Sequence, residues 1–396
     1  MKRYYIATVA VALVILLAFA MIYTPWKLLS EESVLKVGFI YDNDEITPYT
    51  YNFSLAKIAL EKKYPERVVT YTRSNVLEEE VEQPLRELVK AGCSIIFTNS
   101  YSSEFSRLAA DYPQVQICQT AFSNMDRGEE NKNFHTFNGA IYQGRYVCGV
   151  VAGMKLRQLI RDNVITPEEA VLGYVSAFPT AEIISGYTAF LMGARSVVPE
   201  TTMKVKYTGT WNNYNKEKES AAALIDAGCV IIGQHVDTVG TAVACEEAAG
   251  KRPVYHIGYN QSMLDVAPAT SLISTRVNWV PYVTGAVEAL MNGKPIEKYV
   301  QGNIHGNDIG AGFDKGWVEI LEINEAINAE GDQEEISKTI EGFRRGSINV
   351  YRGNYTGVDP YDSGDTCDLS QGYAESKDFS ASSFHYVLND VITVLP

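Results

Sequence analysis

Short apolar runs alternate with amphipathic segments along the first third of the chain. The apolar runs are rich in β-branched and aromatic residues, which is typical of buried strands; they lie at 34–41, 68–73, 93–99 and 115–121. The segments between them have helical apolar spacing, at 51–64, 77–92 and 102–112. Strand–helix–strand alternation predicts parallel βαβ units with helices on both faces of the sheet.

The same alternation returns later in the chain. Predicted strands lie at 170–177, 203–211, 229–235, 253–260 and 271–277, with helices at 180–197, 216–228 and 238–250. The segment LVKAGCSIIFTN (88–99) also aligns with LIDAGCVIIGQH (224–235) at a constant offset of 136 residues. Because this match sits inside two similar series of elements, we predict an α/β protein with two doubly wound lobes. Ligands of such sheets bind at the carboxyl ends of the parallel strands, here in a cleft between the lobes.

The expected domain limits follow from these elements. We expect a first α/β lobe over 34–145, with a segment returning to it at about 275–300, and a second lobe over 146–272. C-terminal segments over 301–396 would return to both lobes. The glycine-rich stretch 302–316 is expected to be a turn that leads into the strand WVEILEI.

The N-terminus predicts an exported protein. Lys2 and Arg3 precede an uncharged run from Tyr4 to Trp26, so residues 1–30 are either a cleaved signal peptide or a retained membrane anchor. Both interpretations place the rest of the chain at the extracytoplasmic face of the cell membrane, because the positive charges stay inside. The net charge of −14 disfavours nucleic acid as a partner.

Motifs for catalysis, cofactors and metals are absent from the sequence. There is no HExxH, GxSxG, P-loop or regular GxGxxG, and the six widely spaced cysteines form no CxxC. Cys93 and Cys229 open apolar runs, where small buried hydrophobes are expected. The stretch DPYDSGDTCD has Asp359, Asp362, Asp365 and Asp368 three apart, unlike a calcium loop, and favours a solvated acidic loop. We therefore expect no catalytic residue, no cofactor and no metal.

Aromatic and hydrogen-bonding residues recur where the predicted strands end. The candidate ligand-binding residues are Tyr49, Tyr51, Phe53, Asn99, Tyr101, Phe178, Trp211, His235, Asp237, Asn260 and Trp279, with Phe122, Tyr259 and Asn278 beside them. Planar rings stack on heterocycles, and carboxylates and carboxamides read polar edges. For each aromatic residue the alternative is core packing, and for Asp237 it is capping of the helix that follows.

Several longer stretches resemble the basic membrane protein family. They are NFHTFNGAIYQGRYVCGVVAG (133–153), GYVSAFPTAEIISGYTAFLMGARSVVP (173–199), TGTWNNYNKEKESAAALIDAGCVIIGQHVDT (208–238), HIGYNQSMLDVAP (256–268) and SASSFHYVL (380–388). The resemblance covers about residues 34 to 396. It implies a periplasmic-binding-protein-like fold of type I and a receptor that feeds a purine nucleobase or nucleoside to ABC permease subunits.

The resemblance also places Trp211, His235 to Asp237, Asn260 and Trp279 in ligand-contact regions. The first loop, YDNDEITPYTYNFSLA, departs from the family wording, so Tyr49 and Phe53 are expected to replace its stacking group. Asn278 stands where nucleoside binders tend to carry a lysine, which favours a free base. The usual lipid-bearing cysteine is missing, so membrane attachment would depend on the N-terminal helix.

Two further functions stay open at this point. A membrane-anchored ligand sensor could use the same fold without an importer. A nucleoside hydrolase would need a metal or an acid–base pair in the cleft, and the sequence offers no recognisable one.

Overall fold

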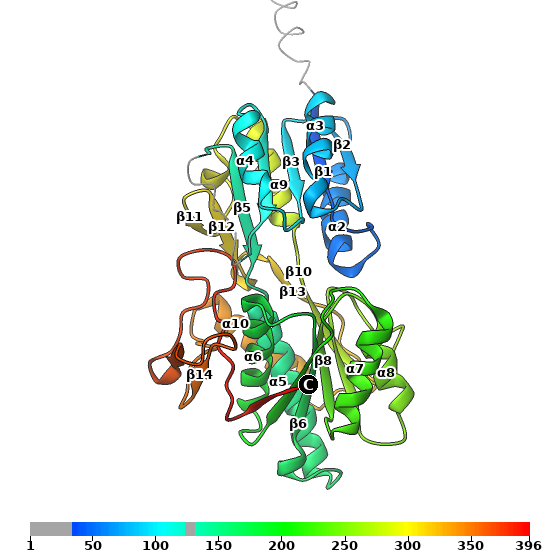
Figure 1. Ribbon diagram of the computed structural model, residues 1–396. Coiled ribbons are helices and arrows are strands. Elements are labelled where there is room, and N and C mark those ends of the chain that lie inside the picture. Colours follow the sequence, from blue (N-terminus) through cyan, green and yellow to red (C-terminus); the bar gives the residue numbers. More distant parts are fainter. Residues whose placement is uncertain (1–33, 123–130) are drawn as a thin grey trace, which may run out of the picture.

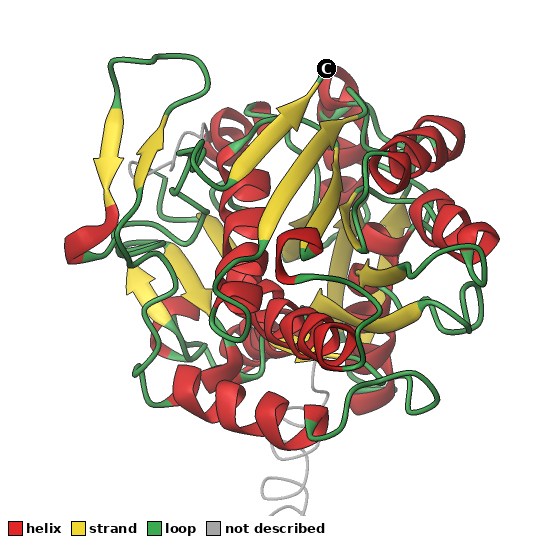
Figure 2. Cartoon of the chain, turned by 90° about the horizontal axis from the view of Figure 1, so that it is seen from below, coloured by secondary structure: helices red, strands yellow, loops and turns green. Residues whose placement is uncertain are grey.

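The computed structural model describes residues 34–122 and 131–396, and the expected signal or anchor at residues 1–30 lies outside them. Two lobes lie one above the other, each built on a seven-stranded sheet (Figure 1). Helices cover both faces of the sheets, as the view from below also shows (Figure 2). The prediction of two parallel-sheet lobes is confirmed. No helix in the described parts of the chain is long and apolar enough to cross a membrane.

The first sheet has the strand order β11-β12-β5-β4-β3-β1-β2. Its strands are β1 (Leu35–Ile40), β2 (Val68–Arg73), β3 (Ile95–Thr98), β4 (Gln116–Thr120), β5 (Phe134–Gly139), β11 (Asn303–His305) and β12 (Asp308–Ala311). The helices of this lobe are α2 (Pro48–Lys63), α3 (Glu82–Lys90), α4 (Glu104–Asp111) and α9 (Val280–Met291). All pairings are parallel except that between β11 and β12, so the carboxyl ends of β1, β3 and β4 meet at one edge.

The second sheet has the order β13-β10-β9-β8-β6-β7-β16. Its strands are β6 (Val171–Ser176), β7 (Thr202–Tyr207), β8 (Ile231–His235), β9 (Tyr255–Tyr259), β10 (Ser271–Val277), β13 (Val318–Ile320) and β16 (Ile392–Leu395). The helices are α5 (Ile141–Arg161), α6 (Ala181–Arg195), α7 (Tyr214–Asp226), α8 (Gly240–Ala248) and α10 (Asp332–Arg344). Only β13 runs antiparallel to its neighbour, β10.

The repeated AGC turn occupies the same place in both lobes. Gly92 ends α3 with φ +88° and Gly228 ends α7 with φ +90°, a left-handed conformation that favours glycine. In each case the following cysteine nitrogen donates at 3.1 Å to a leucine carbonyl of the preceding helix. Cys93 and Cys229 are both 2% exposed, as expected for small buried hydrophobes. The strand orders β5-β4-β3-β1-β2 and β10-β9-β8-β6-β7 correspond, so the sequence match reflects a repeated lobe.

Helices α5 and α6 pack closely in the second lobe because glycines face the opposing backbone. A Cβ built on Gly149 would lie 2.0 Å from the oxygen of Phe190, and one built on Gly193 would lie 2.1 Å from the oxygen of Tyr146. Neither position has room for a side chain. This tight crossing fixes α6, whose first turn faces the other lobe.

The C-terminal segment also connects the two lobes. A hairpin of β14 (Thr356–Val358) and β15 (Thr366–Asp368) precedes it. Glu375 accepts hydrogen bonds from Ser185 in α6 of the second lobe and from the backbone nitrogens of Ser383 and Phe384 later in the same segment. Ser380 then donates from its backbone and hydroxyl groups to the buried carboxylate of Asp308 in β12. We call residues 375–384 the strap.

The expected turn at 302–316 is wrong in part. This stretch contains β11 and β12, a short hairpin that turns at Gly306 with φ +63° and extends the first sheet. Apolar alternation is hard to detect in so short a hairpin, and the pairing of β12 with β5 supplies the backbone partners that the local sequence does not indicate.

An interlobe candidate binding site

The carboxyl ends of the parallel strands of both lobes point toward each other. In the first lobe the loops after β1, β3 and β4 face this region, and in the second lobe the loops after β6, β7, β8 and β9 do so. The backbone nitrogen of Asp237 donates to the oxygen of Trp211 at 2.9 Å, so the loops after β7 and β8 support one another. We call the side chains gathered there the interlobe site: Asp42, Tyr49, Asn52, Tyr101, Phe178, Glu182, Trp211, His235, Asp237, Tyr259 and Asn260.

Two aromatic rings face each other between the lobes. Tyr101 of the first lobe and Trp211 of the second are nearly parallel, with an interplanar angle of 12° and ring centroids 6.2 Å apart. Each is held by an edge-on ring of its own lobe, Phe122 at 4.6 Å and Phe178 at 5.8 Å. A flat ring needs about 3.5 Å on each face, or about 7 Å in total. Since the planes of the two rings are at most about 6.2 Å apart, the lobes would have to separate by at least about 1 Å to admit a planar heterocycle.

Acidic side chains surround the same space. Burial and, to a smaller extent, the charge of Asp42 together raise the pKa of Asp237 to about 8. Burial also raises the pKa of Asp42. Without a ligand, Asp237 is therefore mostly protonated near neutral pH. N–H donors of a bound ligand would favour its ionised form, because an ionised carboxylate is purely a hydrogen-bond acceptor.

His235 is neutral in this environment. Burial lowers its pKa to about 4, and the positive charge of Arg145 acts in the same direction. Its Nε2 lies 3.6 Å from Glu182, and its Nδ1 is buried without a hydrogen-bond partner. The guanidinium of Arg145 lies 3.7 Å from the ring centroid of Tyr259, whose ring meets that of His235 edge-on at 4.6 Å. Arg145 thus holds the ring of Tyr259, and through it that of His235, in place.

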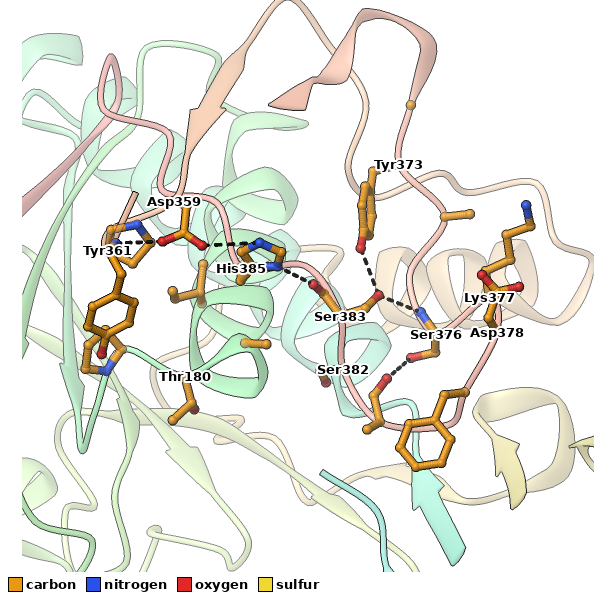
Figure 3. Close-up of a pocket in the computed structure, with 18 residues that line it drawn as sticks. Thr180, Asp359, Tyr361, Tyr373, Ser376, Lys377, Asp378, Ser382, Ser383 and His385 are labelled. Carbon is orange, nitrogen blue, oxygen red and sulfur yellow. Dashed lines mark hydrogen bonds and ion pairs between the residues drawn. The ribbon is translucent and has the colours of Figure 1, made fainter. Parts of the chain in front are cut away.

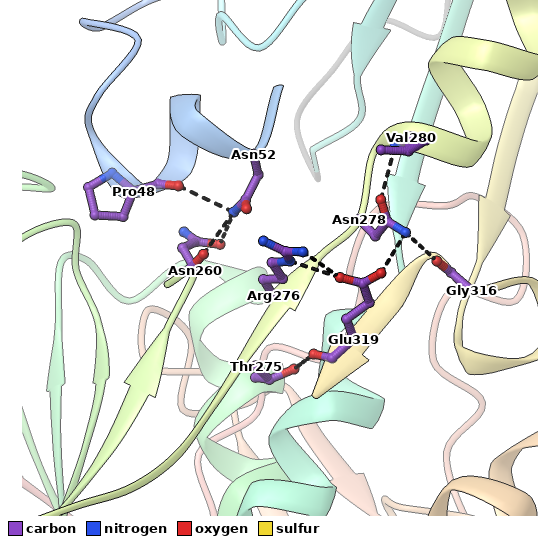
Figure 4. A network of polar contacts seen from close by, with 9 residues as sticks. All are labelled: Pro48, Asn52, Asn260, Thr275, Arg276, Asn278, Val280, Gly316 and Glu319. Carbon is purple, nitrogen blue, oxygen red and sulfur yellow. Dashed lines mark hydrogen bonds and ion pairs between the residues drawn. The ribbon is translucent and has the colours of Figure 1, made fainter. Parts of the chain in front are cut away.

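A pair of asparagines bridges the lobes. Asn52 of α2 donates its Nδ2 to the backbone and side-chain oxygens of Asn260, which follows β9 with φ +64° (Figure 4). The opposite atoms of the two carboxamides, Asn52 Oδ1 and Asn260 Nδ2, are buried without partners. An acceptor and a donor are therefore left at the site, which a polar ligand edge could satisfy.

Some candidates from the sequence have other contacts. Phe53 and Trp279 are buried and stack on each other, with centroids 4.7 Å apart, and Tyr49 packs edge-on against Phe53. Asn99 accepts from the backbone of Asp42 and donates to Thr50, so it positions the loop after β1. Direct ligand contact of these residues stays a prediction.

Two more candidates lie at the margin of the site. The Tyr51 side chain is 42% exposed. Asn278 lies at the hinge, where it donates to Glu319 and to the oxygen of Gly316 (Figure 4). The alternative interpretation of Asp237 as a helix cap is wrong: α8 begins after Val239, and Thr238 accepts from the nitrogen of Gly240.

The sequence interpretation missed four residues of this region. Asp42 directly follows β1, and its position after a buried strand was the available signal. Asn52, Arg145 and Glu182 lie on helices, where only the tertiary structure brings them to the strand ends.

Comparison with known proteins identifies relatives for most of the chain. The family model Bmp, described as "ABC transporter substrate-binding protein PnrA-like", matches residues 32–349. A purine-binding protein of Brucella abortus (strain 2308) is 31% identical over 271 residues, covering 66% of this chain and 70% of the relative. A Haloferax volcanii protein named as an ABC transporter glucose-binding protein is 30% identical over 240 residues, covering 60% of this chain and 56% of the relative.

Solved structures share the fold at low sequence identity. A solute-binding protein of an ABC transporter system from Aeropyrum pernix K1 has a TM-score of 0.64 at 16% identity, covering 83% of this chain and 95% of that one. A transcriptional activator of the comK gene from Bacillus halodurans has a TM-score of 0.61 at 20% identity, covering 79% and 99%. A solute-binding protein and a transcriptional activator thus share this fold.

Proposed function

We propose, from the premise that this chain belongs to the Bmp family of PnrA-like ABC transporter substrate-binding proteins, that it binds a purine base between its lobes and presents it to a permease. Proteins of this family bind a substrate outside the cytoplasm and are not enzymes. The nucleoside hydrolase alternative is therefore set aside. Binding needs no covalent step: a ligand that touches both lobes stabilises the closed form by its preference for that form.

The observation that carries this proposal is the facing pair Tyr101 and Trp211 beside Asp237. The rings are nearly parallel and come from different lobes, so a flat ring between them holds the lobes together. Purine bases also carry N–H donors on their edges, which suit the carboxyl group of Asp237 and the acceptor Oδ1 of Asn52.

The names of the two relatives point to different ligands, so the choice of a base over a sugar depends on the geometry of the site. The Brucella relative is named as a purine-binding protein and the Haloferax relative as a glucose-binding one. A sugar ring is puckered and thicker than a purine ring, so it would need Tyr101 and Trp211 to separate further than the roughly 7 Å that a flat ring needs. Asn278 is engaged at the hinge by Glu319, which favours a free base over a nucleoside that needs a ribose contact there.

Calorimetric titration of the full-length protein tests the proposal. We expect saturable binding of at least one of adenine, guanine, hypoxanthine and xanthine, with weaker binding of the matching nucleosides. Glucose and an amino acid are the controls. Binding of glucose or the amino acid without binding of any purine would overturn the proposal.

Membrane attachment and the choice between import and sensing are separate parts of the proposal. We propose that the apolar run at residues 4–26 directs export and, where retained, holds the chain at the membrane. N-terminal sequencing of membrane-extracted protein distinguishes a retained helix from a cleaved one. Loss of purine uptake on deletion of the gene for this chain would favour import, whereas unchanged uptake with altered gene expression would favour the sensor.

A further inference from the structure

A histidine and two aspartates converge beside the β14–β15 hairpin, away from the interlobe site. Asp359, Asp365 and His385 each place one ligand atom within 4.8 Å of the others. Figure 3 shows two of the three, Asp359 and His385, facing each other. The two aspartates flank the loop of the hairpin, and His385 follows the strap. The acidic stretch was expected to be a solvated loop, and His385 is too distant in the sequence to have been joined to it.

Each of the three residues has its other polar atom fixed by the surrounding chain. His385 Nδ1 donates to the carbonyl oxygen of Ser383 at 2.8 Å, and Nε2 faces the carboxylates. Asp359 Oδ1 accepts from the backbone nitrogens of Tyr361 and Asp362, which leaves Oδ2 free to face Nε2. The outer contacts of metal-binding histidines and carboxylates have this arrangement.

The third residue follows the same pattern. Asp365 Oδ1 accepts from the hydroxyl group of Tyr386 at 3.3 Å, and its Oδ2 faces His385 Nε2. Two carboxylate oxygens and an unprotonated imidazole nitrogen this close together repel one another unless a cation lies between them, whereas a protonated Nε2 would draw the carboxylates to hydrogen-bond distance.

The distances distinguish a metal ion from a proton. Nε2 lies 3.3 Å from Asp359 Oδ2 and 3.7 Å from Asp365 Oδ2. A charge-assisted N–H···O⁻ hydrogen bond is about 2.7–2.9 Å long. Ligand atoms about 2.0–2.2 Å from a tetrahedral zinc ion are about 3.3–3.6 Å from each other. Both observed separations lie closer to the edges of a zinc site than to hydrogen bonds.

A cation would have a path to this point. Asp359 and His385 line a surface cavity of about 980 Å³ that also includes Thr180 at the start of α6 and the strap residues Ser382 and Ser383 (Figure 3). Water from the cavity could fill the remaining coordination positions.

We propose that Asp359, Asp365 and His385 bind a divalent transition-metal cation, with zinc as the class of ion that fits best. The mixed set of one imidazole and two carboxylates suits zinc or manganese better than magnesium, which prefers oxygen ligands and retains its water. The bound ion cross-links the loop of the β14–β15 hairpin to the segment that carries the strap. It therefore stabilises the part of the chain that holds Asp308 of the first lobe. This proposal is independent of the ligand of the interlobe site.

The test is titration of metal-free, full-length protein with ZnCl₂, followed by calorimetry and by thermal unfolding. We expect about one equivalent of zinc to bind and to raise the unfolding temperature. In Asp359→Asn and His385→Gln we expect zinc affinity to fall by at least about tenfold. Asp362→Asn is the matched control, because it removes the same charge from the same loop while its Oδ1 only caps the nitrogen of Gly364.

The outcomes separate the site from general effects of charge or misfolding. Circular dichroism and the unfolding temperature without zinc show whether each variant is folded, and Asp365→Asn provides a second aspartate variant. A manganese titration is run in parallel, and loss of its binding in His385→Gln supports the same site. Calcium prefers oxygen ligands, so binding of calcium without binding of zinc or manganese would overturn the proposal. Absence of stoichiometric binding of all three ions to the unmodified protein would overturn the proposal. Zinc binding that folded His385→Gln and Asp359→Asn retain unchanged would do so too.

Discussion

The Nδ2 of Asn52 donates to both oxygens of Asn260 across the two lobes, at 3.2 Å each. Because the contact joins the two lobes, it stabilises their closed arrangement. Asn52→Ala should therefore shift the protein toward the open form, since a hydrogen bond contributes about 0.5–1.5 kcal/mol. We expect purine affinity to fall by about two- to tenfold and the radius of gyration without ligand to increase in small-angle scattering. An unchanged radius together with unchanged affinity would contradict the role of this pair.

Trp211→Ala should weaken purine binding more strongly than the loss of the asparagine pair. Stacking of a base on an aromatic ring contributes about 1–3 kcal/mol, which corresponds to a loss of affinity of about 5- to 150-fold. Trp211→Phe should retain most of the affinity because it keeps a flat ring opposite Tyr101. Calorimetry with the base that binds best to the unmodified protein measures both variants. Equal affinities for the two variants would show that no ring stacks on Trp211.

Asp237→Asn should weaken ligand binding and stabilise the ligand-free protein. Burial and the charge of Asp42 raise the pKa of Asp237 to about 8. Ionisation in the unfolded chain therefore lowers folding stability progressively as pH rises from about 4 to 8. Removing the carboxyl group removes this cost, so the gain in unfolding temperature should be larger at pH 8 than at pH 5.

The expected loss of ligand binding in Asp237→Asn has a different cause from its gain in stability. A hydrogen bond to a charged group contributes about 1.5–3 kcal/mol, so purine affinity should fall by about 10- to 150-fold at pH 8. Calorimetry at pH 8 and thermal unfolding at both pH values provide the two readouts. A variant that binds normally and gains stability would indicate that Asp237 does not contact the ligand.

His256 should contribute to the loss of stability in acid. It is fully buried beside Gln234, and burial lowers its pKa to about 3. The unfolded chain takes up a proton below about pH 6.5, whereas the folded chain does not. Stability is therefore fully present above pH 6.5 and is lost by about 1.4 kcal/mol per pH unit as pH falls from 6.5 toward 3.

The matched comparison is His256→Gln, which keeps a polar group beside Gln234. Urea unfolding at pH 7, 6 and 5 should show that the difference in unfolding free energy between the two proteins changes in favour of the variant as pH falls. Other titrating groups, including Asp237, are common to both proteins and cancel. A constant difference across this range would contradict the burial of a neutral His256.

Gly193→Ala should destabilise the second lobe. The new methyl group would lie 2.1 Å from the oxygen of Tyr146, a backbone atom that can move only if α5 and α6 separate. Overpacking of this kind costs about 1–3 kcal/mol or more. Gly342→Ala in α10 is the control, because the nearest atoms there belong to the flexible side chain of Ile348. Urea unfolding should show a loss for the first variant and a much smaller effect for the second.

The sequence by itself determined the elements and their repetition. Apolar runs such as 68–73 and the left-handed glycines Gly92 and Gly228 act locally, so the strands, the helix ends and the two-lobed α/β class could be predicted from them. It also indicated the aromatic residues at the strand ends, because parallel strands place their carboxyl ends at one edge.

Only the tertiary structure decided which of those residues meet. Phe53 and Tyr101 read alike in the sequence, yet one ring is buried on Trp279 and the other faces Trp211. Partners such as Asn52 with Asn260, or Asp359 with His385, are distant in the chain and come together through the packing of whole lobes. The physical reason is that periodicity reports which face of an element is buried, whereas the contacts between faces depend on lobe closure and on the path of the C-terminal strap.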